Sequence, residues 1–284
     1  MSALQVVALV IQASILLTVF GIGLSASPAD VLHVLERPAR LLRAMLAMFV
    51  VMPVLAVLLD ELFELRPAIE VALVALAISP IPPLLPRRQG QAGGDTGYGV
   101  GLMVTMAVLS VVLVPLAVRL LGLVFGREFS TDPGAIALMV LKAVVAPLVL
   151  GMLCRRLLPG LADRLRKPAG MVGNVLLTLA GLVILFAARG VLGGLLGTGT
   201  LLALAGFVAA GLAVGHCLGG PEAHGRTVLA LANACRHPGI ALAVAGANFP
   251  GDQEVTGAIL LYLVVNIVVC MPYVKWRQRH AAGP

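Results

Sequence analysis

Long apolar stretches alternate with short polar segments along the whole chain. A hydrocarbon core about 30 Å thick needs roughly 20 apolar residues in one helix, and nine stretches approach or exceed that length. They are expected near residues 4–25, 40–60, 67–96, 98–122, 134–154, 170–190, 198–218, 225–248 and 254–275. The pattern predicts an all-α polytopic membrane protein that forms a single domain over residues 1–284.

Two of the stretches contain polar, proline-bearing breaks. The first break spans residues 79–88 and the second spans residues 233–239. Proline has no N–H and clashes with the preceding turn, so each break frees backbone groups that lipid cannot satisfy. Two interrupted helices in corresponding halves of a chain indicate the binding site of a secondary transporter. The expected break residues are Pro80, Pro82, Pro83, Pro86, Pro238 and Gly239.

The order of plain and broken stretches is the same in both halves of the chain. The first four stretches are plain, plain, broken and plain, and the last four repeat that order. Five stretches separate each matching pair, so the two halves would lie in opposite orientations, as inverted-topology repeats require. We therefore expect a first repeat at about residues 4–122 and a second at about 134–275.

The basic residues favour one orientation in the membrane. Of the 20 Lys and Arg residues, fourteen fall on one side of the predicted stretches and four on the other, while Lys142 and Arg236 lie within stretches. Positive charge gathers in cytoplasmic loops. We expect a multi-pass protein of the plasma (inner) membrane, with its N-terminus outside and its C-terminus in the cytoplasm.

The composition excludes a soluble globular chain. The sequence is 60% hydrophobic and 12% charged, with a mean hydropathy of +1.04, and a soluble domain of this size could not cover so much apolar surface. The net charge of +7 does not indicate nucleic-acid binding, because the basic residues sit in short loops beside apolar stretches. No cofactor is expected, and the oligomeric state stays open.

Arg236 is the strongest candidate for binding chemistry. It lies about nine residues into the eighth stretch, roughly 14 Å from that end at 1.5 Å per residue, and an arginine side chain can span only part of that distance. A charge at this depth requires a carboxylate, backbone carbonyls or an anionic ligand. Arg236, His237 and Asn233 therefore either contact substrate or satisfy carbonyls freed by the break.

Three further cations are candidate substrate ligands. Arg87 and Arg88 follow the first break, where they either line a cavity opposite Arg236 or anchor the helix end at the cytoplasmic surface. Lys142 stands alone in the fifth stretch, where it either supplies a counter-charge or extends outward to the interface. Because carboxylates are scarce in the stretches, such a cavity would prefer a small anionic solute, and the other expected partner is the lipid bilayer.

Gly211, Gly215 and Gly219 recur every four residues in the seventh stretch. Small residues at this spacing let two helix backbones approach closely in a membrane. We expect this row to be a packing face and not a binding motif.

Short motifs in order along almost the full chain resemble the bile acid:sodium symporter family and its wider relatives. They are Gly21-Ile22-Gly23-Leu24-Ser25, Leu35-Glu36-Arg37-Pro38, Phe49-Val50-Val51-Met52-Pro53, Ala92-Gly93-Gly94-Asp95, residues 144–151 and Gly239-Ile240-Ala241-Leu242-Ala243. The resemblance implies a fold derived from ten helices, here with nine, divided into a mobile core and a panel. It also implies two broken helices that cross near mid-membrane, and an organic anion carried with sodium between core and panel.

The chain departs from this family at the positions that the resemblance assigns to sodium binding. The family's glutamate on the second broken helix falls at Ala232, and two hydroxyl ligands on the following helix of the first half fall at Met103 and Ala107. Sodium requires a cage of oxygen atoms, which hydrocarbon side chains cannot supply. We therefore expect behaviour independent of sodium, with the Arg236 guanidinium as a substitute for the ion's charge.

The expected function is alternating-access transport of a small organic anion, not coupled to sodium in the family's usual way. One alternative is a non-transporting receptor or scaffold that keeps the fold. Another is a membrane-embedded enzyme, but neither an HExxH nor a GxSxG motif occurs, so no catalytic residue and no metal site are expected.

Overall fold

The computed structural model describes residues 3–26, 28–82, 85–125, 133–187, 199–249 and 251–281. All regular elements in these ranges are helical, as the sequence predicts. The helices of the first half are α1 (Ala3–Gly23), α2 (Pro28–Leu35), α3 (Pro38–Leu46), η1 (Ala47–Val51), α4 (Met52–Phe63), α5 (Pro67–Ile78), α6 (Leu85–Gln91) and α7 (Thr96–Phe125). Those that follow are α8 (Pro133–Val140), η2 (Leu141–Val145), α9 (Ala146–Leu157), α10 (Pro159–Ala187), α12 (Thr200–Leu218), α13 (Ala223–Ala234), α14 (Pro238–Asn248) and α15 (Gln253–Ala281).

The helices follow the predicted stretches, with two differences. The short helix α2 was not expected, and α10 begins at Pro159 instead of near residue 170, since proline is well suited to the first turn of a helix. Five described segments are long and apolar enough to cross a membrane: Pro38–Phe63, Thr96–Leu120, Thr200–Leu218, Ala223–Asn248 and Gln253–His280. The count of nine crossings therefore stays a prediction.

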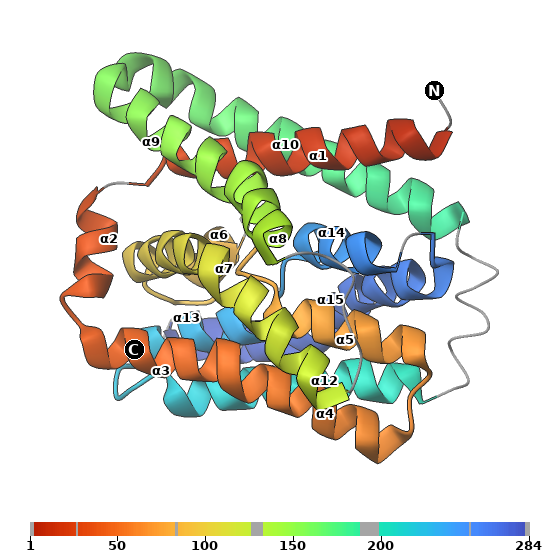
Figure 1. The fold of residues 1–284 in the computed structure, drawn as a ribbon. Coiled ribbons are helices and arrows are strands. Elements are labelled where there is room, and N and C mark those ends of the chain that lie inside the picture. Colours follow the sequence, from red (N-terminus) through yellow and green to blue (C-terminus); the bar gives the residue numbers. More distant parts are fainter. Residues whose placement is uncertain are drawn as a thin grey trace.

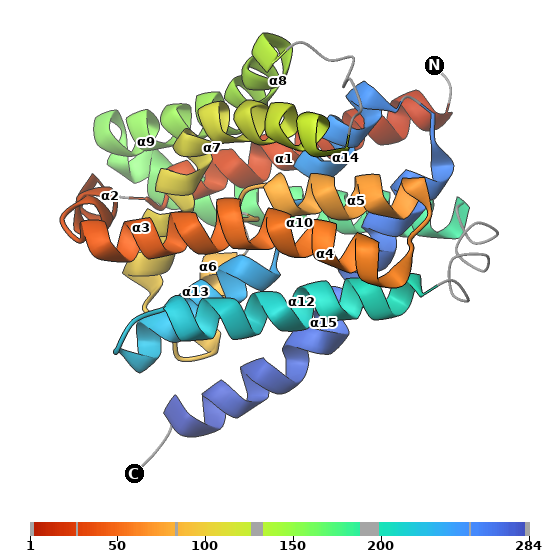
Figure 2. The same cartoon turned by 60° about the horizontal axis from the view of Figure 1, so that its bottom comes forward.

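The helices form two groups (Figure 1). Helix α1 packs against α9 and α10, and we call these three the outer layer. In the second group, the main bundle, α12 packs on α13 and α15, and α5 packs on α4, α14 and α15. Helices α6 and α7 belong to the main bundle through their contacts with α13, and α7 also contacts α8, which continues through η2 into α9 of the outer layer. Figure 2 shows the C-terminal part of α15 extending away from the bundle.

Prolines explain the two π-helical turns in the fold. Both η1 and η2 are followed by a residue and then a proline, Pro53 after η1 and Pro147 after η2. In each case the intervening residue donates its N–H five residues back, from Met52 to Ala47 O and from Ala146 to Leu141 O. Wider turns of this kind accommodate a proline, which has no N–H to donate within the helix.

Glycines set the closest helix contacts in both groups. A Cβ atom on Gly211 would lie 3.0 Å from Ala234 Cα, and one on Gly215 would lie 2.5 Å from Ala230 Cα, so α12 and α13 touch backbone to backbone. This confirms the predicted packing face on the seventh stretch. In the outer layer, a Cβ on Gly23 would lie 2.9 Å from Gly151 Cα, which brings α1 equally close to α9.

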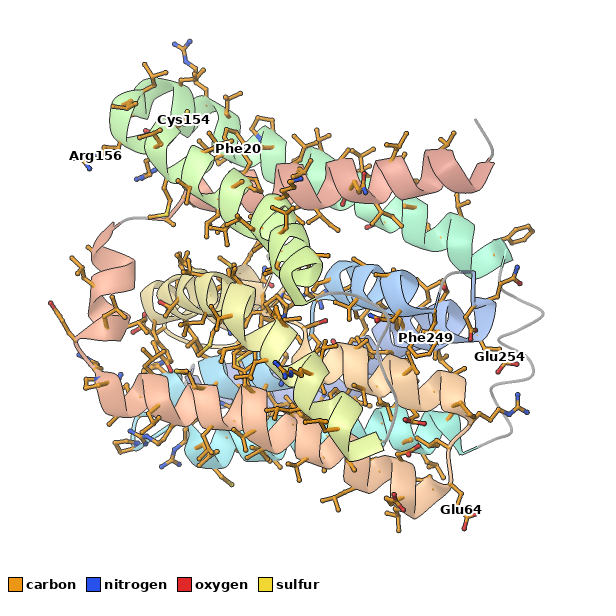
Figure 3. All side chains as sticks on the ribbon, in the orientation of Figure 1. Phe20, Glu64, Cys154, Arg156, Phe249 and Glu254 are labelled. Atoms are coloured by element: carbon orange, nitrogen blue, oxygen red, sulfur yellow. The ribbon has the colours of Figure 1, made fainter. Side chains whose placement is uncertain are left out.

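The labelled side chains in Figure 3 mark the two ends of the molecule. In Figure 3, Cys154 and Arg156 lie at one end of the helices, and Glu64, Phe249 and Glu254 lie at the other. The chain termini also lie at opposite ends in Figures 1 and 2. The end that carries Arg156 is the one that the basic residues predict to face the cytoplasm.

Substitution of Gly215 by alanine should destabilise the protein, because the new methyl group would meet the α13 backbone, which cannot rotate away. We expect a loss of about 2 kcal/mol or more, as for other overpacked sites. The matched control is Gly181→Ala in α10, where no atom lies within 4 Å of an added Cβ. Thermal unfolding in detergent should show a lower Tm only for Gly215→Ala, and equal Tm values would contradict the packing described here.

Candidate functional site

The two interrupted helices cross in the interior of the main bundle. Helix α5 packs against α14, and α6 packs against α13, so each half of one broken helix meets the opposite half of the other. The backbone between the halves is extended at Ser79 and at Cys235. His237 N donates to Pro80 O at 3.0 Å and ties the two breaks directly together.

Pro238 leaves one carbonyl of the crossing without its helical partner. In an α-helix the N–H of residue 238 would bond to Ala234 O, but proline has none. Ala234 O instead accepts from Tyr262 Oη at 2.8 Å and from Asn266 Nδ2 at 2.9 Å, both on α15. Arg236 N donates to the same Tyr262 Oη at 2.6 Å.

Arg236 satisfies two further carbonyls that prolines leave open. Ser79 O would bond to the N–H of residue 83, which is proline, and in the π-helical register of η1 Met48 O would bond to the N–H of Pro53. Arg236 Nη1 donates to Ser79 O at 3.2 Å, and Nη2 donates to Met48 O at 3.0 Å. The guanidinium therefore joins the second break to the first break and to η1.

The side chain of Arg236 is enclosed by the protein. It is 1% exposed, and its Nη2 also lies 3.4 Å from Asn233 Oδ1, while Asn233 Nδ2 donates to Gly211 O at 3.2 Å. The arginine thus satisfies carbonyls that prolines leave open in other elements, while Asn233 joins α13 to a carbonyl in the middle of α12. Contact of either residue with substrate stays a prediction.

His237 caps the second half of its broken helix. Its Nδ1 accepts from Ile240 N at 3.3 Å, so in the neutral ring the proton resides on Nε2. The ring is 3% exposed, and Nε2 has no hydrogen-bond partner among the described residues. His237 thus presents a buried N–H donor beside the crossing, and such a donor is costly to leave unpaired.

A cavity of about 850 Å³ lies between the outer layer and the main bundle. It is bounded by α1 and α10 on one side and by α6 and α7 on the other. Its polar lining consists of Thr18, Ser25, Arg87, Thr96, Arg166 and Lys167. Its apolar lining includes Ile22, Val100, Met103, Met171 and Val175. None of the described lining residues carries a carboxylate, so the fixed charge of the lining is positive.

The structure brings some of the other predicted site residues to this cavity. Arg87 lines it, whereas the adjacent Arg88 is exposed on α6 and does not belong to its described lining. Lys142 is exposed in η2, a turn that packs against α1 and α7. Pro86 lies within the first turn of α6 and not in the break itself, and Pro83 lies outside the described residues.

The sequence reasoning missed four residues that the geometry makes prominent. Arg166 and Lys167 were used only to predict the orientation in the membrane, although they line the same cavity as Arg87. Tyr262 and Asn266 were not noticed. Their spacing of four residues in an apolar stretch places two polar side chains on one helix face, and that signal could have indicated an inward-facing polar stripe.

An all-α chain with two crossing interrupted helices, and a polar cavity beside them, defines a multi-pass membrane protein of the transporter class. Residues 13–193 match the sequence model of the sodium bile acid symporter family. The match covers more than half of the chain, and the protein belongs to that family. A comparison with curated proteins gave no significant match.

The positions that the family resemblance assigns to sodium carry no oxygen atoms in their side chains. Ala232 is 0% exposed, Met103 is 4% exposed and Ala107 is 6% exposed. Nearby, the Ser79 and Met48 carbonyls already accept from the Arg236 guanidinium. These described residues do not fit a sodium cage.

Arg236→Ala should destabilise the protein by about 3 kcal/mol or more, because two buried carbonyls lose their charged donor. Arg236→Lys should recover only part of the loss, since one ammonium group cannot occupy both Nη positions. Added ethylguanidinium at millimolar concentration should raise the Tm of Arg236→Ala and leave the parent protein unchanged. A normal Tm for Arg236→Ala, or no difference between the two proteins on adding ethylguanidinium, would contradict this role.

Proposed function

We propose that the protein is a secondary transporter of a small organic anion that works by alternating access. The outer layer would correspond to the panel and the main bundle to the core. The chain would cross the membrane nine times in two inverted repeats, at about residues 4–122 and 134–275. Family membership and the matching order of plain and broken helices support this arrangement.

The cavity between outer layer and main bundle is the observation that carries the proposal. Three cations, Arg87, Arg166 and Lys167, line it, and no described lining residue is a carboxylate. Arg166 also lies 3.8 Å from Asp163 outside the lining, so the net charge of the lining stays positive, and positive charge with low-dielectric walls concentrates anions. The hydroxyl groups of Thr18 and Ser25 already donate to Ser14 O and Gly21 O of their own helix, and Thr96 adds a third hydroxyl group to the lining. The remaining apolar wall suits a solute with an organic body and not only an inorganic ion.

The same charges support the proposed orientation in the membrane. Arg87, Arg166 and Lys167 lie in segments that the distribution of basic residues places at the cytoplasm. With the N-terminus outside and the C-terminus inside, the cavity would open to the cytoplasm. The described conformation would then be the inward-facing state of the transport cycle.

The chemistry of the crossing supports independence from sodium. Arg236 carries a permanent positive charge and donates to a carbonyl of the first break, Ser79 O, and to a carbonyl of η1, Met48 O. A fixed guanidinium cannot leave with the substrate as a bound ion can. Transport driven by the anion gradient, or linked to protons, is therefore favoured over sodium symport.

The two alternative functions differ in their support. A membrane enzyme would need His237 beside a nucleophile or carboxylate, but in the described residues its ring bonds to a backbone N–H. A non-transporting receptor would also bind an anion in the cavity. Transport assays separate that receptor from the transporter.

A thermal-shift screen of purified protein against anionic metabolites, with and without sodium, should identify ligands through a concentration-dependent rise in Tm. For any anion found, Arg87→Gln, Arg166→Gln and Lys167→Gln should each weaken binding by about tenfold, as expected for a lost charge-assisted bond. Arg88→Gln and Arg164→Gln are matched controls next to the cavity residues and should bind normally. Equal losses in both sets, or stabilisation by organic cations only, would refute the site.

Uptake of such an anion into proteoliposomes should be the same in sodium, potassium and choline media. The family's usual sodium cage lacks its side-chain oxygens here, so no step should require the ion. A steep dependence of uptake on a sodium gradient would reject this part of the proposal. Binding without uptake in any medium would favour the receptor alternative.

A further inference from the structure

One face of α1 connects the cavity to the crossing. Thr18, Ile22 and Ser25 line the cavity, and Ile15 precedes Thr18 by three residues, which places it on the same face, about one turn farther along. Ile15 is 7% exposed. It is therefore the next side chain on this face beyond the cavity, in the direction of the crossing.

Ile15 lies directly against the start of the second half of the broken helix. A Cβ atom built on Gly239 would fall 2.5 Å from Ile15 Cδ1 and 3.2 Å from Ile15 Cγ1. The same point lies 3.2 Å from His237 Cε1, the ring atom between the two nitrogens. The end of the Ile15 side chain thus occupies the space that the absent Gly239 side chain leaves beside the His237 ring.

The contact joins two parts that the proposed cycle would move against each other. Ile15 is carried by the outer layer, where Ser14 Oγ next to it donates to Gly173 O of α10 at 2.9 Å. Gly239 and His237 belong to the main bundle. An apolar side chain at such a contact excludes water without forming a bond that must be broken. The buried Nε2–H of His237, which has no described partner while the contact is closed, would gain one when water enters.

We propose that Ile15 is an apolar gate that seals the cation-lined cavity from the polar crossing at His237. This inference rests on the proposed function. It states that the contact between Ile15 and Gly239 is the one that opens and closes during the transport cycle. When the outer layer shifts, Ile15 leaves Gly239 and the His237 edge becomes accessible. A glycine at position 239 leaves room for this contact, because an added methyl group would force the end of the Ile15 side chain to move.

Cysteine accessibility in the full-length protein tests the seal without a known substrate. In a background with Cys154, Cys217, Cys235 and Cys270 replaced by alanine, the reporters are Ser25→Cys in the cavity and His237→Cys behind the gate. Sodium (2-sulfonatoethyl)methanethiosulfonate, a membrane-impermeant anion, should label Ser25→Cys at least about tenfold faster than His237→Cys, as burial protects a thiol. Adding Ile15→Ala should accelerate labelling of His237→Cys alone.

Leu16→Ala is the matched control, because Leu16 is 43% exposed on another face of α1. It should leave both labelling rates unchanged. Equal labelling of the two reporters when Ile15 is present would overturn the gate, and so would a His237→Cys rate that Ile15→Ala does not alter. Either result could occur while the cavity still binds anions, so failure of the gate and failure of the proposed function are distinguishable.

A size exchange tests the contact itself and does not depend on a cysteine reporter. Gly239→Ala places a methyl group against Ile15 Cδ1 and should lower the Tm by about 5 °C, as an overpacked site does. Ile15→Val removes that Cδ1 atom, so the double variant Ile15→Val/Gly239→Ala should return to within about 1 °C of Ile15→Val alone. If the Tm losses of the two single variants add up in the double variant, the two side chains do not compete for the same space.

Discussion

The structure depends on hydrogen bonds to backbone carbonyls that prolines leave open inside the bundle. Three such carbonyls meet at the crossing, on Ala234, Ser79 and Met48, and each accepts from a buried side chain. An unpaired carbonyl in this interior would cost a few kcal/mol. The donors Tyr262, Asn266 and Arg236 are therefore as necessary to the two breaks as the prolines that create them.

This constraint explains why a cation can reside so deep in a membrane protein. Arg236 offers several N–H groups in a planar fork, and its two Nη atoms reach carbonyls of different elements. A single bound ion could hold the same carbonyls only with further oxygen ligands, which the chain lacks at Ala232, Met103 and Ala107. In the proposed function, this fixed guanidinium would take the place of the positive charge of a bound sodium ion.

Much of the fold could be predicted from apolar length and proline position. Both stretches are interrupted within the predicted ranges, although each break is shorter than expected, because residues 85–88 already belong to α6 and residues 238–239 to α14. The row of Gly211, Gly215 and Gly219 packs as its spacing indicated. The partners of Arg236 could not be predicted, because the Met48 carbonyl is open only in the wider register of η1, and a following proline such as Pro53 permits that register without requiring it. Likewise, nothing in the sequence places Arg166 and Lys167 opposite Arg87, since that proximity depends on how the outer layer packs on the bundle.

The most direct test of the account is a high-resolution cryo-electron microscopy map of the protein in lipid nanodiscs, determined once with sodium and once without it. The account predicts guanidinium density within hydrogen-bond distance of the Ser79 and Met48 carbonyls in both maps. A guanidinium directed into the cavity, with an ion between those carbonyls only in the sodium sample, would contradict it.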